Sequence, residues 1–133
     1  MREIREIIIH CSATPEGREV SLEEMHRWHV HRGFSDVGYH FLVHLDGRVE
    51  AGRPLHRTGA HCRGHNVGSI GICYIGGLTA TDRSPKDTRT PAQREALHAL
   101  VTLLRLHFPK ATLHGHNEFA AKACPCFDVQ QAW

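Results

Sequence analysis

The sequence lacks a hydrophobic run long enough to cross a membrane or to form the core of a signal peptide. Its first residues alternate charged and apolar side chains, and the run Ile7-Ile8-Ile9 that follows is far too short for either purpose. We therefore expect a soluble protein that is made in the cytoplasm without a signal peptide and inserts into no membrane.

The sequence also lacks a strong excess of one charge and a disulfide framework. It has 16 Lys and Arg against 14 Asp and Glu, a net charge of +2, and no long basic stretch. This balance excludes the electrostatic footprint of a nucleic-acid-binding protein. The 5 cysteines form neither tandem CxxC pairs nor a regular spacing, so we expect reduced thiols or a thiol ligand rather than disulfides.

The length of 133 residues suits a single domain over residues 1–133. In chain order, we expect a strand over 4–10, a helix over 22–32, strands over 37–45, 48–52 and 69–75, a helix after Thr90-Pro91-Ala92-Gln93 that ends before Pro109, and a strand over 111–116. This order predicts an α/β (mixed α+β) fold in which helices flank a central mixed β-sheet.

Local signals support several of these elements. Ser21 with Glu24 forms a capping box at the start of the first helix, and Thr90 with Gln93 forms another at the start of the second. Asp46-Gly47 predicts a two-residue hairpin turn between the second and third strands. Residues 54–68 are rich in Gly, His and Arg without periodicity, which is typical of a long irregular loop that carries function or is disordered.

Histidine is abundant, with 13 residues, and this directs attention to metal chemistry. A catalytic zinc site uses three ligands drawn from His, Cys and carboxylates and leaves one position open. The candidates are His10 at the end of a central strand, His114 and His116 on one face of the last strand, and Cys124 eight residues later. The competing interpretation is that His10 only ends a strand and that Cys124 is a small buried hydrophobe.

Two other groups of residues invite a functional interpretation. His26, His29 and His31 share a predicted helix, but no Cys or carboxylate completes a second metal site, so a solvated helix face is favoured. The neighbours His61 and Cys62 suggest a thiol hydrolase, although the sequence identifies no residue that would orient them.

Six ordered motifs resemble those of zinc-dependent N-acetylmuramoyl-L-alanine amidases, the family that includes peptidoglycan-recognition proteins and the short T-odd phage lysozymes. The resemblance covers nearly the whole chain. It is carried by Ile9-His10-Cys11-Ser12-Ala13-Thr14, Asp36-Val37-Gly38-Tyr39-His40-Phe41, Asp46-Gly47-Arg48-Val49-Glu50-Ala51-Gly52-Arg53, Asn66-Val67-Gly68-Ser69-Ile70-Gly71-Ile72, Thr90-Pro91-Ala92-Gln93, and His116-Asn117-Glu118 with Lys122-Ala123-Cys124-Pro125.

The resemblance implies an amidase fold and specific roles for seven residues. It implies that a Zn²⁺ ion is bound by the three ligands His10, His116 and Cys124. It implies that Tyr39 and Lys122 flank the metal and assist catalysis, and they are also the candidates for the general acid or base. The loop from His61 to Ser69, including Asn66, is implied to line the substrate groove, although His61 can equally be a surface histidine.

The resemblance further implies an endolysin-like enzyme that cleaves the bond between N-acetylmuramic acid and the L-alanine of the stem peptide. Its partner would be peptidoglycan, which it would reach as a monomer after holin-type release, lysis or export. The alternative is a non-hydrolytic peptidoglycan-binding or regulatory protein on the same scaffold. The chain departs from the family pattern at Asn117 and at Cys126, which stands where relatives have a small polar residue and places a second thiol near Cys124.

Overall fold

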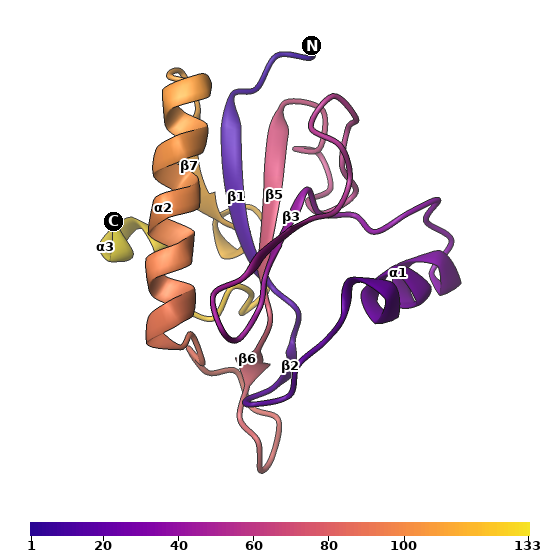
Figure 1. Cartoon of the computed structure of the whole chain (residues 1–133), viewed down its shortest axis with the longest axis vertical. Helices are drawn as coiled ribbons and strands as arrows, with labels where there is room; N and C mark the ends of the chain where they lie inside the picture. The colour runs from indigo at the N-terminus through magenta and orange to yellow at the C-terminus, as the bar shows by residue number, and fades with distance from the viewer.

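A computed structural model describes the whole chain, residues 1–133, as a five-stranded mixed sheet with a long helix on one face and a shorter helix on the other (Figure 1). The strand order is β4-β3-β5-β1-β7, and only the β3–β4 pair is antiparallel. The five strands are β1 (Glu6–Cys11), β3 (Phe41–Val43), β4 (Val49–Ala51), β5 (Ser69–Tyr74) and β7 (Thr112–Gly115). The predicted mixed sheet flanked by helices is confirmed.

The central strand β1 is buried on both faces, and β5 and β7 pair with its two edges. Its β-branched residues suit this position. Ile7 and Ile9 pack into the main core beside α2. Alternation along the strand therefore turns His10 to the opposite face, where its β5 neighbour Cys73 packs with residues of α1.

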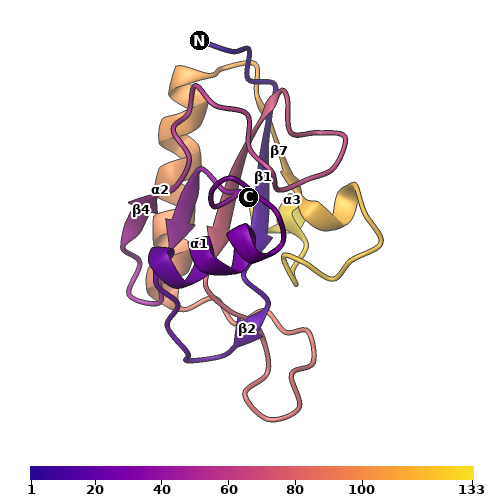
Figure 2. The same ribbon diagram turned by 90° about the vertical axis from the view of Figure 1, so that its right-hand side faces the viewer.

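The two main helices lie on opposite faces of the sheet, as Figures 1 and 2 show. Helix α2 (Pro91–His107) begins with the predicted capping box between Thr90 and Gln93, and its apolar stripe joins the main core. Helix α1 (Leu22–His31) begins at Ser21, whose hydroxyl accepts from the Glu24 backbone N–H. The Glu24 carboxylate instead accepts from Arg18, so only half of that capping box forms.

Strands β3 and β4 form the predicted hairpin, but its turn is longer than the sequence suggested. His44 N–H donates to Arg48 C=O, which leaves a loop of three residues instead of two. Gly47 adopts a φ of +87° in this loop, a conformation that glycine reaches without strain. The prediction of a two-residue turn is therefore wrong, because Leu45 joins Asp46 and Gly47 in the turn.

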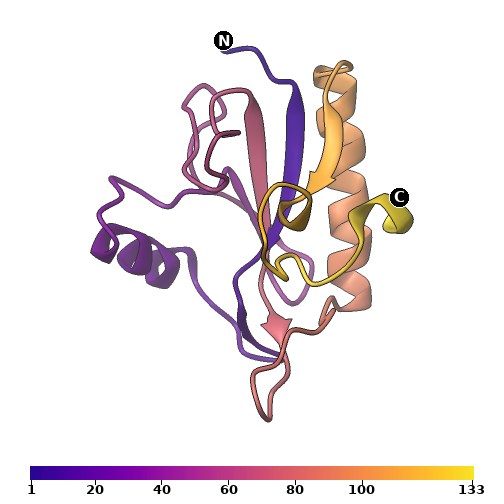
Figure 3. The same ribbon diagram turned by 180° about the vertical axis from the view of Figure 1, so that it is seen from behind.

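Short elements complete the fold. They are the two-stranded sheet of β2 (Thr14–Pro15) and β6 (Gly77–Leu78), a 3₁₀ turn η1 (His116–Glu118), and α3 (Val129–Ala132). The segment after β7 passes the carboxyl end of β1, and α3 then packs against β7 (Figure 3). No helix is both long and apolar enough to span a membrane.

A candidate metal centre and groove

Three predicted ligands from distant parts of the chain meet at the carboxyl ends of parallel strands, where open sheets commonly form binding sites. His10 lies near the end of β1, His116 opens the 3₁₀ turn after β7, and Cys124 follows in the next loop. The ligand atoms of these three residues all lie within 4.8 Å of one another. No other group of three or more His, Cys, Asp or Glu side chains has this geometry.

The distances in this cluster suit a tetrahedral metal ion. The Nδ1 atoms of His10 and His116 are 3.2 Å apart, and the Cys124 Sγ lies 3.9 Å from His10 Nδ1. Bonds of about 2.0 Å to nitrogen and about 2.3 Å to sulfur require tetrahedral edges of roughly 3.3 and 3.5 Å. The His–His–Cys group can therefore hold a metal ion after only small adjustments.

The electrostatics of the cluster keep its imidazoles neutral, which is the protonation state that binds metals. Burial lowers the pKa of His10 well below its usual value, and the nearby His61, His116 and Lys122 lower it further. Burial also lowers the pKa of His116, with a smaller contribution from the Lys122 ammonium.

His61 contacts the cluster from behind. Its Nδ1 lies 2.8 Å from His10 Nε2, the ring nitrogen that faces away from the other ligands, and its Nε2 lies 3.1 Å from the Ser69 hydroxyl. Burial lowers the pKa of His61 to about 3, and the positive groups nearby add to this effect. Both ring nitrogens are thus engaged within the protein, although the residue also lines the groove.

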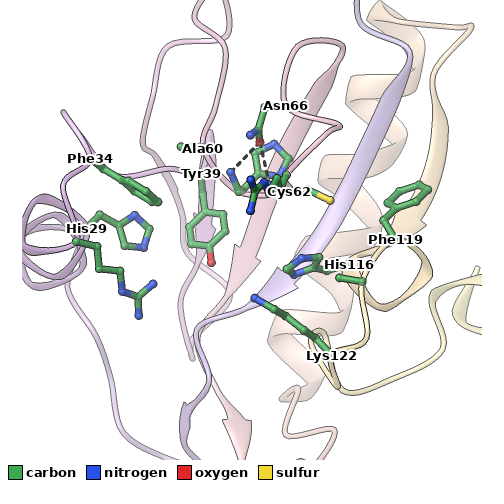
Figure 4. Close-up of a pocket in the computed structure, with 13 residues that line it drawn as sticks. His29, Phe34, Tyr39, Ala60, Cys62, Asn66, His116, Phe119 and Lys122 are labelled. Atoms are coloured by element: carbon green, nitrogen blue, oxygen red, sulfur yellow. Dashed lines mark hydrogen bonds between the residues drawn. The ribbon is translucent and has the colours of Figure 1, made fainter.

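A cavity of about 770 Å³ lies in front of the cluster, between the α1 side of the sheet and the turn after β7. Its walls are formed by His29, Arg32, Phe34, Tyr39, Ala60, His61, Cys62, Arg63, Asn66, His116, Phe119, Ala120 and Lys122 (Figure 4). No Asp or Glu belongs to this lining, whereas Arg32, Arg63 and Lys122 do. The groove therefore favours an anionic ligand.

Tyr39 and Lys122 flank His116 within this groove. Figure 4 shows the Tyr39 hydroxyl and the Lys122 amine both directed toward the space beside His116. Burial raises the pKa of Tyr39 well above its usual value, so its hydroxyl keeps its proton. The Tyr39 ring also lies 5.1 Å from the His10 ring, measured between centroids.

Asn66 shapes the loop around His61. Its Oδ1 accepts hydrogen bonds of 2.9 Å from the backbone N–H groups of both His61 and Cys62. The residue lines the groove, and its carbonyl oxygen is committed to holding this turn.

Two glycines, Gly59 and Gly71, leave the space that the His61 ring occupies, and this role was not predicted from the sequence. A Cβ atom added to Gly71 would lie 2.6 Å from two atoms of the His61 ring, and one added to Gly59 would lie 2.7 Å from it. Gly71 belongs to the motif of residues 66–72, where its missing side chain was a possible signal, whereas Gly59 lies outside every motif. Ser69 was also missed as the hydroxyl partner of His61.

The remaining candidates stay outside the cluster. The ring nitrogens of His114 contact Thr112 and Glu118 instead of a metal position. His26 pairs with Asp36, and His29 accepts from the Gly38 backbone N–H, so the helical histidines do not converge.

None of the other four cysteines belongs to the cluster, in which Cys124 is the one thiol. Burial raises the pKa of the Cys62 thiol, which removes the activation that a thiol hydrolase needs. The Sγ of Cys126 lies 3.8 Å from that of Cys11, and all five cysteines are free thiols.

Comparisons with known proteins agree with this geometry. The sequence profile of the N-acetylmuramoyl-L-alanine amidase family matches residues 1–127. The endolysin of Klebsiella phage KP32 is 42% identical over 132 residues, which cover 99% of this chain and 87% of the relative. The solved amidase LysC from Clostridium intestinale has a TM-score of 0.84 and 26% identity, over 98% of this chain and 83% of that one. The ectodomain complex of peptidoglycan recognition proteins LCa and LCx with tracheal cytotoxin gives a TM-score of 0.75 and 33% identity, over 94% and 77% of the two chains.

Proposed function

Because this chain belongs to the N-acetylmuramoyl-L-alanine amidase family, we propose that it hydrolyses the amide bond between N-acetylmuramic acid and the L-alanine of the peptidoglycan stem peptide. The observation that carries this proposal is the convergence of His10, His116 and Cys124, of which His116 lines a groove about 770 Å³ in volume. Residues 1–133 would form one catalytic domain that acts as a monomer.

The donor set of two imidazoles and one thiol suits Zn²⁺, which we propose as the metal. Three protein ligands are the number found in catalytic zinc sites. When bound, the ion would supply a water of lowered pKa and would polarise the amide carbonyl. His10 and His116 would hold it as neutral imidazoles, because burial keeps their pKa values low.

Tyr39 and Lys122 would stabilise the oxygen that becomes negative as the amide is attacked. The raised pKa of Tyr39 keeps its O–H available as a donor, and the Lys122 amine points into the same space beside His116. A donor already directed at the developing charge accelerates such reactions strongly. The same two groups are the candidates for delivering a proton to the leaving amine.

The lining of the groove supports a peptide substrate that carries carboxylates. Arg32, Arg63 and Lys122 contribute positive charge, and no acidic residue opposes them. His61 and Asn66 would line the substrate-binding wall, with the Asn66 oxygen fixing the loop that contains both.

The named relatives support a place of action. The Klebsiella phage relative is an endolysin. We propose that this chain likewise degrades the cell wall, after holin-type release, cell lysis or export carries it to its substrate.

A non-hydrolytic peptidoglycan-binding or regulatory protein is the competing function. The complete ligand group, together with Tyr39 and Lys122 beside it, favours the enzyme. Zinc content by elemental analysis, combined with a turbidity assay on cell walls, separates the two: the binding protein would leave turbidity unchanged.

The decisive test is mass spectrometry of purified peptidoglycan after digestion. We expect glycan strands free of peptide and stem peptides with a free L-alanine amine. Cut sugar linkages or cut peptide crosslinks would contradict the proposal. Cys124→Ala should lose both zinc and activity, whereas Cys126→Ala, in the same loop but with its Sγ beside Cys11, should keep both.

A further inference from the structure

His10 is held from two sides, and only one of them is the proposed metal position. Its Nδ1 faces His116 and Cys124, while its Nε2 faces His61 Nδ1 at 2.8 Å. The ring is almost completely buried, so no water can replace His61 as the partner of Nε2 without rearrangement. The orientation of His10 therefore depends on His61.

The His61 ring itself is confined to this one position. Gly59 and Gly71 leave space for the imidazole where any side chain would overlap it. Asn66 Oδ1 accepts hydrogen bonds from the backbone N–H groups of His61 and Cys62, which fixes this part of the loop, and Ser69 Oγ lies 3.1 Å from the far ring nitrogen of His61. A ring that is held at its backbone and at its far nitrogen, with no free space on the side of Gly59 or Gly71, can serve to orient a neighbour.

The hydrogen bonds between these residues have two possible directions. In one direction, His10 Nε2–H donates to His61 Nδ1, and His61 Nε2–H donates to Ser69 Oγ, which leaves His10 Nδ1 with a free lone pair. In the reverse direction, the Ser69 hydroxyl donates to His61, and His61 donates to His10 Nε2. His10 then carries its proton on Nδ1, the atom that faces the other ligands, and cannot bind a metal there.

We propose that His61 is a positioning residue: together with Ser69 it holds His10 in the orientation and tautomer that present Nδ1 to the metal. Partners of this kind commonly fix a ligating histidine, and they are usually a carboxylate, a backbone carbonyl or water. Here a second imidazole fills that position. The inference rests on the proposed metal centre and gives His61 a role distinct from contact with substrate.

The test measures Zn²⁺ affinity by competition with a chelator, in the absence of substrate. His61→Leu removes the acceptor for His10 at similar volume, and we expect binding weaker by about 10- to 100-fold. His61→Asn places an amide oxygen near the former Nδ1, and we expect it to restore most of the affinity. His40→Leu is the matched control, because His40 is a buried histidine beside His61 that bonds only Arg2 and backbone groups of Arg57 and Gly71.

The outcomes separate this inference from the proposed function. A wild-type chain that binds no Zn²⁺ would overturn the metal centre itself. Wild-type affinity in His61→Leu, or an equal loss in His40→Leu, would overturn only the role of His61. If His61→Leu does not fold, Ser69→Ala decides, since it deletes a single oxygen: weaker Zn²⁺ binding supports the chain of hydrogen bonds, and unchanged binding refutes it.

Discussion

A methyl group added at Gly71 should weaken the proposed metal centre without touching any of its three proposed ligands. Gly71 lies within β5, and a Cβ there would approach the His61 ring to 2.6 Å at Cδ2, 2.6 Å at Cγ and 2.8 Å at Nδ1. Neither the Gly71 backbone nor the His61 ring can easily move away. The Gly71 backbone is paired with β1, and His61 is held by hydrogen bonds at its backbone N–H and at its far ring nitrogen. The overlap must therefore displace the ring.

The size of the effect follows from these distances. Relief of the overlap requires a shift of roughly 1 Å, which would stretch the 2.8 Å contact with His10 beyond hydrogen-bonding range. Overpacking of this kind costs about 1–3 kcal/mol of unfolding free energy. Loss of the partner of His10 should weaken Zn²⁺ binding by about 10- to 100-fold.

The assay compares Gly71→Ala with Gly68→Ala. In the control, the new Cβ would meet only the end of the flexible Arg5 side chain, at 2.8 Å, which can move away. Urea unfolding of the metal-free proteins measures stability, and chelator competition measures Zn²⁺ affinity. Unchanged stability in Gly71→Ala would show that the space around the His61 ring can accommodate a methyl group. Lower stability with unchanged Zn²⁺ affinity would refute the proposed effect of His61 on the metal centre.

Three further outcomes are expected. Tyr39→Phe should lower the rate of peptidoglycan cleavage by about 100-fold with zinc content unchanged, since one donor to the developing oxyanion is lost; a rate within about threefold of wild type would argue against that role. Urea unfolding of the metal-free chain should show lower stability at pH 5 than at pH 7. In the folded chain the pKa is about 4 for His29 and His40 and about 3 for His61, below the usual 6.5. Between those folded-state pKa values and 6.5 the unfolded chain therefore binds up to about three more protons than the folded chain, so its free energy falls as the pH is lowered. An unfolding free energy that does not change between pH 7 and pH 5 would contradict this. Gln93→Leu should cost about 2–3 kcal/mol in the same assay, because the buried amide caps α2 and donates to the backbone carbonyls of Val43 and Ile75. A loss below about 0.5 kcal/mol would show that those groups find other partners.

The elements that the sequence predicts well depend on local patterns. The run Ile7-Ile8-Ile9 indicates a strand buried on both faces, and Thr90 with Gln93 fixes the start of α2 through hydrogen bonds within one turn. The hairpin turn was less predictable, because Asp46-Gly47 suits both a two-residue loop and the observed three-residue loop. Packing of the neighbouring strands decides between them, and that information is not local.

The site divides in the same way. His10, His116 and Cys124 were found through residue type and through motifs that resemble a family, and the structure brings their ligand atoms together. The contact between His10 and His61 was not foreseen, because it depends on the register that sets Cys73 of β5 beside His10. No spacing along the chain encodes which side chain lies behind a ligand.

The positions of the three proposed ligands along the chain also determine when the proposed metal centre can form. His10 and His116 are separated by 106 positions along the chain, and His10 and Cys124 by 114. Such a centre is a contact of very high order, so its assembly needs the sheet to be complete from β1 to β7. A ribosome must therefore finish nearly the whole chain before any hydrolytic capacity appears. Fragments that lack the segment with His10, or the segment with His116 and Cys124, would have no hydrolytic activity. Incomplete chains would therefore not cleave the cell wall while synthesis is still under way.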